Sequence, residues 1–321
     1  MEYSEIGIMM LRACNASCEI CCIESNPGCK EKLNAELVKK YIHSTMNLKQ
    51  IVGIGLTGGE VFLEYDQLKE LVKYIAECGK NATVMTNCFW AKNYETAYRK
   101  LYELKKLGLT ALGVSFDYYH NQYVSELKVR NALKAARQLS IATAINTVRV
   151  AGRPMGDVFE RLGDDLLETV VQSFPCYPVG GAKKSIPDEE FIRRTPSSRQ
   201  RCRSGGTFSI KYDGNIYPCC SPYVFETELS FGNYETSTAA DTLKKMKISR
   251  IMYVLRNYGF DYFIRIAKNK LGIEVPDYSI TSCELCALFF SKKNINRFYP
   301  YVYETTEMLI NKQNGKMIKE I

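Results

Sequence analysis

Short apolar runs alternate with amphipathic helical patterns from residue 5 to about residue 180. In the segment 65–77, for example, Leu68, Leu71 and Ile75 recur at spacings of three and four, which places them on one helical face. The pattern predicts strands at residues 5–11, 50–56, 82–86, 111–116, 142–150 and 169–174, and helices at residues 34–46, 65–77, 94–107, 124–139 and 157–162. Repeated strand–helix units predict an α/β fold with a parallel, buried sheet. Because a closed barrel of eight units needs roughly 250 residues, these six units predict an open, partial (β/α)6 barrel.

The pattern changes in the second half of the chain. Residues 182–203 are polar and basic and indicate a connector. A hairpin is predicted at residues 208–217, where Asp213-Gly214-Asn215 separates two short apolar runs. Two helical patterns follow, at residues 239–257 and 260–270. The sequence therefore predicts a barrel domain and a small C-terminal module, at residues 1–190 and 191–321.

Cysteine usage separates this chain from an ordinary α/β protein. There are 13 cysteines and two histidines. The N-terminus lacks a secretory signal, and no apolar run approaches the ~18 residues of a membrane span, so we expect a cytoplasmic protein without membrane contact. A reducing cytosol keeps thiols free, which favours metal binding or catalysis over disulfides. With so few histidines, iron–sulfur ligation is the leading expectation.

The charge of the chain is moderately positive. Lysine and arginine number 43 against 35 aspartates and glutamates, a net charge of +8. This excess is typical of a mildly basic, solvated surface, and it would suit an acidic peptide or another anionic partner. The sequence has no long basic run, so we expect no nucleic-acid partner.

Three cysteines follow directly after the first predicted strand, in the sequence Cys14-Asn-Ala-Ser-Cys18-Glu-Ile-Cys21. A [4Fe–4S] cluster held by four thiolates is coordinatively closed, whereas three thiolates leave one iron open to a further ligand. The alternative is a structural zinc site, for which Cys22 or Cys29 would supply the fourth ligand.

The second predicted strand ends in Leu56-Thr57-Gly58-Gly59-Glu60. Ligands of α/β sheets and barrels bind at the carboxyl ends of strands, where glycines permit close backbone approach. Three cysteines at this spacing, followed after one βα unit by Gly-Gly-Glu, resemble the radical S-adenosylmethionine (SAM) superfamily over residues 5–182. The resemblance implies a partial (β/α)6 barrel, one [4Fe–4S] cluster on Cys14, Cys18 and Cys21, and SAM bound to the open iron.

The same resemblance implies contacts to SAM at several strand ends. Gly58, Gly59 and Glu60 would hold the methionine amino group. Polar residues of the later strands would contact the ribose and the methionyl carboxylate: Asn87, Ser115, Asp117 and Asn146. Val179, in Pro178-Val179-Gly180-Gly181, would lie where the adenine usually sits. From the residues alone, each of these later positions is equally an ordinary strand-end polar group or turn.

The C-terminal module carries a second group of five cysteines: Cys202, Cys219, Cys220, Cys283 and Cys286. Four thiolates from separated segments would enclose a second cluster and stabilise a module that lacks a large core. A zinc ribbon is the alternative. Five cysteines for four ligand positions leave one thiol over, and neighbouring residues of an extended backbone point in different directions. One of Cys219 and Cys220 is therefore expected to ligate while the other faces the barrel mouth.

The hairpin ending in Tyr-Pro-Cys-Cys, followed by Cys-x-x-Cys, resembles the SPASM or "twitch" auxiliary-cluster modules of peptide-modifying radical SAM enzymes. Five segments are similar to the YydG-type radical SAM peptide epimerases: Cys14-Asn-Ala-Ser-Cys18, Thr57-Gly-Gly-Glu-Val-Phe-Leu, Tyr217-Pro-Cys-Cys-Ser-Pro, Phe225-Glu-Thr and Phe298-Tyr-Pro-Tyr301. That family implies conversion of L- to D-residues in a ribosomal precursor peptide. It implies Cys220 as the hydrogen-atom donor, with Cys202, Cys219, Cys283 and Cys286 on the auxiliary [4Fe–4S] cluster.

The expected partners are the precursor peptide and an electron donor of flavodoxin or ferredoxin type. Since 13 residues precede Cys14, we expect peptide binding by the barrel or the C-terminal module. The similarity is looser between residues 182 and 206, which favours a role for that segment in substrate choice. Two alternatives stay open: a radical maturase that forms thioether or C–C crosslinks, and a non-enzymatic zinc or redox scaffold.

Overall fold

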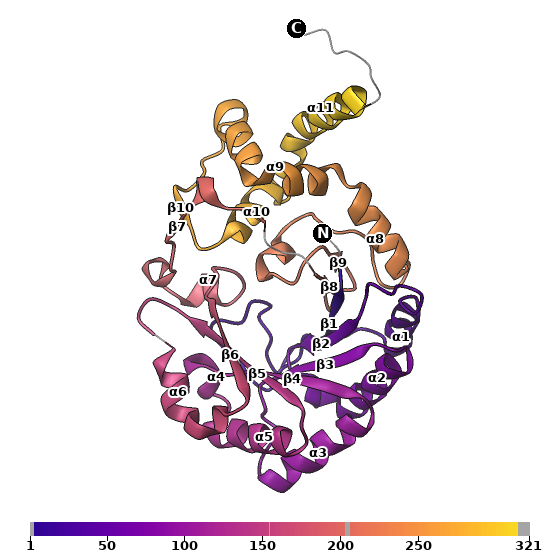
Figure 1. Cartoon of the computed structure of the whole chain (residues 1–321). Helices are drawn as coiled ribbons and strands as arrows, with labels where there is room; N and C mark the ends of the chain where they lie inside the picture. Colours follow the sequence, from indigo (N-terminus) through magenta and orange to yellow (C-terminus); the bar gives the residue numbers. More distant parts are fainter. Residues whose placement is uncertain (1–2, 154, 203–205, 314–321) are drawn as a thin grey trace.

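A computed structural model of the chain describes residues 3–153, 155–202 and 206–313. Its centre is one sheet in the order β6-β5-β4-β3-β2-β1-β8-β9 (Figure 1). The strands are β1 (Glu5–Leu11), β2 (Gly53–Gly58), β3 (Asn81–Thr86), β4 (Leu109–Ser115), β5 (Ala142–Arg149), β6 (Thr169–Pro175), β8 (Thr207–Ile210) and β9 (Ile216–Tyr217). Strands β1 to β6 are parallel and neighbour one another in chain order. The predicted α/β fold with a partial barrel is therefore confirmed.

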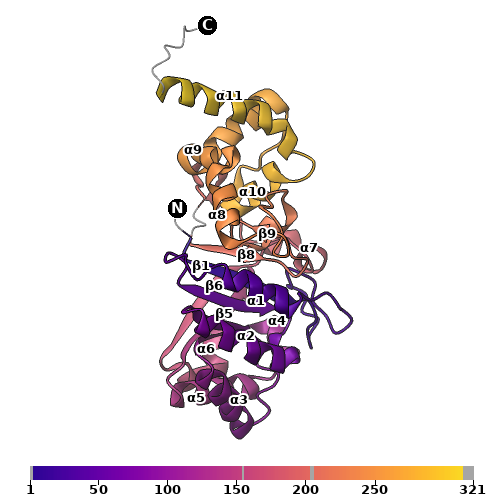
Figure 2. The ribbon, with the colours of Figure 1, turned by 90° about the vertical axis from the view of Figure 1, so that its right-hand side faces the viewer.

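The crossover helices lie along the outer face of this curved sheet, except for the short α4 (Tyr118–Asn121), which lies at the carboxyl ends of the strands (Figures 1 and 2). The others are α1 (Ala35–His43), α2 (Tyr65–Glu77), α3 (Tyr94–Lys106), α5 (Glu126–Gln138) and α6 (Gly156–Leu162). Local sequence sets their starts. The side chain of Asn34, for instance, accepts hydrogen bonds from the N–H groups of Glu36 and Leu37 and so caps α1.

The main core lies between the sheet and these helices. In β1 the buried Ile6 and Ile8 alternate with partly exposed residues. They belong to the same apolar cluster as the buried residues of α2, such as Leu71 and Ile75. The alternate strand positions point to the concave side, since successive strand residues face opposite ways. Several of those positions are small, including Gly113, so the inside of the barrel keeps space.

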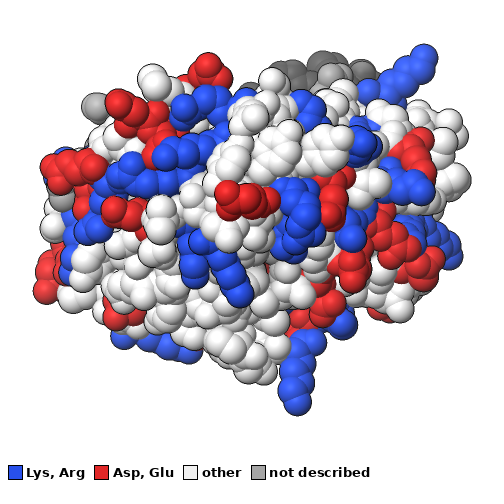
Figure 3. Space-filling view, turned by 90° about the horizontal axis from the view of Figure 1, so that it is seen from below, with Lys and Arg blue, Asp and Glu red and all other residues white. Residues whose placement is uncertain are grey.

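On the face seen from below in Figure 1, acidic and basic side chains are interspersed (Figure 3). On that face neither positive nor negative side chains form one large continuous area.

The C-terminal part is mainly helical. Its elements are α7 (Ala182–Ser185), β7 (Thr195–Pro196), α8 (Ala239–Ile248), α9 (Arg250–Ile266), β10 (Tyr278–Ser279), α10 (Ser282–Phe290) and α11 (Ile295–Gln313). A second core forms here around Phe263, whose ring packs against those of Phe290 and Phe298. In the part of the chain that the structure describes, no helix combines the length and apolar character needed to cross a membrane.

One boundary in the C-terminal helices differs from those predicted, and another agrees. The helix predicted at residues 239–257 is interrupted at Ser249, whose hydroxyl caps α9 by accepting from the Met252 N–H. The break predicted before residue 260 is present as a kink at Gly259, with φ of 69°.

The predicted hairpin does not stand apart from the barrel. Strand β8 pairs in parallel with β1, with Glu5 opposite Thr207 and Ile8 opposite Ile210. The auxiliary segment thus extends the barrel sheet beyond its first strand. The predicted connector reaches the hairpin through Arg203, which lies outside the described residues, and the division at residue 190 stays a prediction.

Candidate active site

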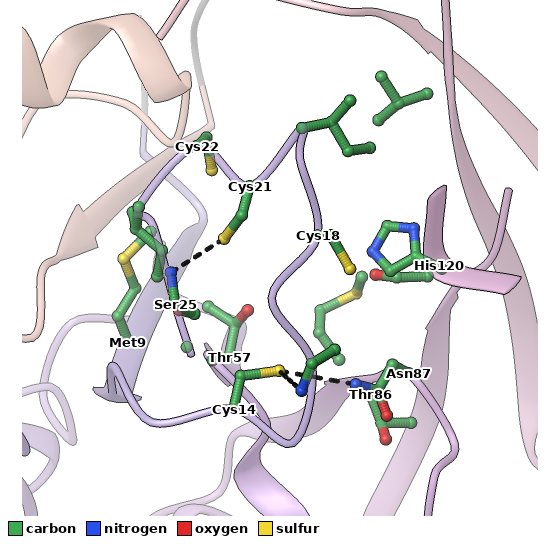
Figure 4. A pocket seen from close by; sticks show the side chains of 18 residues that line it. Met9, Cys14, Cys18, Cys21, Cys22, Ser25, Thr57, Thr86, Asn87 and His120 are labelled. Atoms are coloured by element: carbon green, nitrogen blue, oxygen red, sulfur yellow. Dashed lines mark hydrogen bonds between the residues drawn. The ribbon is translucent and has the colours of Figure 1, made fainter. Parts of the chain in front are cut away.

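A cavity of about 260 Å³ opens at the carboxyl ends of the barrel strands (Figure 4). The three cysteines of the loop after β1, Cys14, Cys18 and Cys21, all line it. Figure 4 shows their sulfur atoms directed toward a common space, with Thr57 and Asn87 contributed by the ends of β2 and β3. The structure therefore brings together the predicted thiolates and the predicted strand ends.

Gly58 and Gly59 hold the cysteine loop against the end of β2. A Cβ on Gly58 would lie 2.3 Å from the Leu11 carbonyl oxygen, and one on Gly59 would lie 2.0 Å from that of Ala13. The Gly59 N–H donates to the Leu11 carbonyl at 2.8 Å. Both positions therefore require glycine, because the end of β2 packs directly against the backbone of the segment that leads into the cysteine loop.

A second pair of glycines holds the loop from the other side. Cβ atoms on Gly180 and Gly181 would meet the carbonyl oxygens of Cys22 and Glu19 at 2.5 and 2.7 Å. The Gly181 N–H also donates to the Cys21 carbonyl at 2.9 Å. Val179, expected at the adenine, is buried and is not among the residues that line the cavity.

The thiol sulfurs accept hydrogen bonds that would support thiolate ligands. The Ala16 N–H donates to Cys14 Sγ at 3.4 Å, and the Ser25 N–H donates to Cys21 Sγ at 3.2 Å. Burial raises the pKa of Cys14 to about 12, so ionisation at neutral pH requires a bound cation. Among the described residues, no group of three His, Cys, Asp or Glu side chains is arranged to hold a single metal ion. A soft, all-sulfur donor set around a shared cavity fits an iron–sulfur cluster.

Glu60 lies behind the cavity wall instead of lining it. Its carboxylate is fully buried and accepts from the N–H groups of Phe62 and Asn87, at 3.0 and 2.7 Å, and from the Thr86 hydroxyl. Burial raises the pKa of Glu60 to about 7, although these hydrogen bonds oppose the shift. The side chain therefore joins the ends of β2 and β3, and the amino-group contact implied by the resemblance stays a prediction.

Replacing Glu60 with Gln is expected to lower the free energy of unfolding by about 1–3 kcal/mol. The reason is that one carboxylate oxygen becomes an NH2 group facing N–H donors. Urea unfolding followed by far-UV circular dichroism measures the loss. Glu64→Gln is the matched control, because Glu64 makes a solvent-exposed ion pair with Lys32. Equal losses in the two variants would contradict the bridging role.

The later strand ends divide into two groups. Asn87 and Ser115 line the cavity, as expected, and Asn87 Nδ2 lies 3.7 Å from Cys14 Sγ. Asn146 and Asp117 are not among its lining residues. Asn146 donates instead to Met85 Sδ at 3.5 Å.

Asp117 acts on the cavity through His120. It caps α4 by accepting from the N–H groups of Tyr119 and His120, and its Oδ1 lies 2.9 Å from His120 Nδ1. Burial alone would raise the pKa of Asp117, but the His120 charge and these hydrogen bonds lower it below its usual value. Asp117 therefore fixes the His120 ring, which does line the cavity.

Met85 is a cavity residue that the sequence analysis missed. Its side chain crosses the position that a Cβ on Gly113 would occupy, since that atom would lie 2.1 Å from Met85 Sδ. Met85 in β3 lies opposite Gly113 in β4, and the glycine leaves room for the methionine side chain. This pairing could be recognised only after the strand register was known.

The second cysteine group surrounds a small cavity of about 20 Å³. Cys202, Cys219, Cys283 and Cys286 all line it, together with apolar residues such as Phe260. Cys219 is buried, and Cys220 is exposed and is not among the lining residues. Four thiols around one enclosed space, from three separated segments, have the chemistry of a closed cluster site.

The charged state of Cys220 is felt by Tyr177, the second residue after β6. Burial raises the pKa of Tyr177, just after β6, and the nearby thiols of Cys283 and Cys220 raise it further. Tyr177 in turn packs against Tyr223 with ring centroids 5.1 Å apart. The hairpin thus places Cys219 in the auxiliary cavity, whereas Cys220 is exposed and is among the lining residues of neither cavity, so its expected place at the barrel mouth stays a prediction.

These features agree with the comparisons to known proteins. The radical SAM superfamily model matches residues 8–158, and the SPASM iron–sulfur cluster-binding domain matches residues 202–287. The chain is 32% identical over 310 residues to "Putative peptide biosynthesis protein YydG" of Bacillus subtilis (strain 168), covering 94% of this chain and 97% of the relative. The chain therefore belongs to the radical SAM superfamily, as a YydG-type member with a SPASM module.

Two solved structures share the fold at low identity. One is anSMEcpe with bound AdoMet and the Cp18Cys peptide, 14% identical with a TM-score of 0.54, covering 95% of this chain and 99% of that one. The other is BtrN in complex with AdoMet and 2-DOIA, 15% identical with a TM-score of 0.51, covering 87% of this chain and 97% of that one. Both comparisons support the architecture described above.

The protein is thus a radical SAM enzyme, and its cofactors are SAM and [4Fe–4S] clusters, with the auxiliary iron–sulfur ligation in the SPASM domain. The donor chemistry of both cavities fits these groups, since eight cysteines line them, Cys22 in addition to the seven predicted ligands, and no carboxylate is among their lining residues in the described chain.

Proposed function

We propose that this enzyme converts chosen L-residues of a ribosomally made precursor peptide to D-residues. A peptide substrate is supported by the name of the B. subtilis relative, which refers to peptide biosynthesis. The observation that carries epimerisation is the extra thiol. Four cysteines line the auxiliary cavity, while the neighbouring Cys220 is exposed and lies outside that set.

In this proposal Cys14, Cys18 and Cys21 hold the cluster in the barrel, and Cys202, Cys219, Cys283 and Cys286 hold the auxiliary cluster. Gly58 and Gly59 set the cysteine loop at the strand ends, and Asn87 and Ser115 border the SAM site. When bound, the cofactor supplies a carbon-centred radical from SAM that removes a hydrogen atom from a peptide Cα. The apolar parts of the cavity limit water beside that centre.

Cys220 would complete the inversion. Its S–H bond breaks, one hydrogen atom passes to the opposite face of the planar Cα, and a new Cα–H bond forms. The sulfur is then one electron and one proton short. A one-electron donor of flavodoxin or ferredoxin type, together with a proton from solvent, would restore the thiol.

The mass of the product made in deuterated water tests the proposal. A thiol exchanges its hydrogen with solvent, so each inverted residue should carry one deuterium, while the product made in ordinary water should keep its mass. The experiment uses the anaerobically reconstituted enzyme and a short peptide encoded beside its gene, with chiral amino-acid analysis after hydrolysis.

The alternative reactions give different results in the same experiment. A crosslinking maturase would yield a product lighter by two hydrogens and no D-residue, which would overturn epimerisation while leaving peptide modification in place. A zinc or redox scaffold would bind zinc, cleave no SAM and contain far fewer than the roughly eight irons of two [4Fe–4S] clusters.

A further inference from the structure

A second hollow lies at the same edge of the sheet as the cofactor cavity, with a volume of about 460 Å³. It is formed by the end of β5, by β6 and by the segment after α7. The residues that line it are Arg149, Val150, Ala151, Met155, Ser173, Ile192 and Arg194. No acidic side chain is among these lining residues in the described part of the chain.

The two arginines of the hollow are exposed and carry uncompensated charge. Neither Arg149 nor Arg194 forms an ion pair with any residue that the structure describes. Their neighbours differ: Arg193 pairs with Asp188 and Glu284, and Arg153 lies over the Tyr118 ring at 3.5 Å. Two guanidinium groups without a partner, bordering one hollow, are suited to a carboxylate.

Ser173 contributes an unsatisfied polar atom to the same hollow. Its hydroxyl oxygen is buried and makes no hydrogen bond within the described structure. In the β5–β6 register Thr147 lies opposite Ser173, and Arg149 lies opposite Pro175. Since alternate strand residues share a face, Ser173 and Arg149 project to the same side of the sheet. A buried hydroxyl without a partner is costly unless a ligand supplies one.

The hollow is adjacent to the cofactor cavity. Val148 lines the cofactor cavity, and Arg149, the next residue of β5, lines the hollow. The two sites therefore lie on opposite sides of one strand end. Because β6 has a strand neighbour on one side only, the rim between them is not covered by a further strand of the sheet. A peptide that occupied both sites would cross the ends of β5 and β6.

We propose that this hollow binds an acidic side chain of the peptide substrate and thereby sets which residue reaches the cofactor cavity. Arg149 and Arg194 take the carboxylate, and the Ser173 hydroxyl donates a hydrogen bond to it. Ile192 and Met155 cover the aliphatic part of the bound side chain. This inference rests on the proposed peptide substrate, but its binding step needs neither SAM nor electron transfer.

Fluorescence anisotropy on the full-length reconstituted enzyme tests the inference. The probes are short fluorescein-labelled Gly/Ser peptides that carry either a pair of glutamates or a pair of glutamines. Wild-type enzyme should bind the glutamate peptide about tenfold or more tightly at low salt, the magnitude expected for charged hydrogen bonds. The double variant Arg149→Gln/Arg194→Gln should lose that preference. The double variant Arg149→Glu/Arg194→Glu should prefer a lysine peptide instead.

Lys244→Gln/Lys247→Gln is the control, because it removes the same charge from the exposed face of α8. It should keep the preference for glutamate. Equal binding of the two peptides by wild-type enzyme, or an equal loss in the control variant, would overturn the acidic-residue site. Such a result would not bear on epimerisation, which the deuterium experiment tests separately. Conversely, a product without deuterium would contradict epimerisation and would not change the binding result.

Discussion

Cys220→Ala enzyme is expected to cleave SAM at a rate near that of wild-type enzyme and to form no D-residue. The side chain is exposed and does not line the auxiliary cavity, so its loss should leave both clusters in place. Without the thiol, the Cα radical has no hydrogen donor on its second face. The measurements are deoxyadenosine by liquid chromatography and deuterium incorporation by mass spectrometry.

The adjacent cysteine supplies a sharp contrast. Cys219 is buried in the auxiliary cavity, and Cys219→Ala should lower the iron content of the module while Cys220→Ala should not. Iron and sulfide analysis of the two variants separates ligand from donor. If Cys220→Ala enzyme still inverts residues, the hydrogen comes from elsewhere and the role assigned to Cys220 is wrong. If Cys219→Ala retains all its iron, the ligand set is wrong.

Gly59→Ala is expected to abolish SAM cleavage. The added Cβ would lie 2.0 Å from the Ala13 carbonyl oxygen and 2.6 Å from the Arg12 carbonyl oxygen. Both contacts are with backbone, so no side-chain rotation relieves them, and the loop carrying Cys14 must move away from β2. We expect the iron content to fall by about half, since roughly four of eight irons belong to this cluster.

The control for Gly59→Ala is Gly156→Ala, at the start of α6. No atom lies within 4 Å of the Cβ position at Gly156, and alanine there should be neutral or stabilising by up to about 1 kcal/mol. Gly181→Ala, with a contact of 2.7 Å to the Glu19 carbonyl oxygen, should give an intermediate loss of iron. Full iron content and SAM cleavage in Gly59→Ala enzyme would show that this close approach is dispensable.

Local pattern was sufficient for most of the barrel. Period-two and period-3.6 spacing predicted strands close to β1 and β5 and a helix matching α2, because each element is amphipathic by itself. Spacing along one loop also predicted Cys14, Cys18 and Cys21 as a unit, and the structure places all three on one cavity. The interruption at Ser249 was missed because the apolar spacing continues across it.

The side-chain partners could not be read from the chain. The motif that contains Glu60 gave no sign that Thr86 and Asn87, at the end of the next strand, donate hydrogen bonds to its carboxylate. Asp117 similarly engages His120 and the Val148 N–H. These contacts depend on how adjacent strand ends meet in space, which a strand-end motif does not specify.

By itself, the sequence determined the α/β architecture, the three-cysteine loop and the surplus of one thiol, because these follow from local periodicity and from counting. Only the tertiary structure decided that β8 joins β1, that Cys219 lines the auxiliary cavity while Cys220 does not, and that Arg149, Ser173 and Arg194 share one hollow. The physical reason is that strand pairing and side-chain direction depend on contacts between segments far apart in the chain, whose energies no local pattern contains.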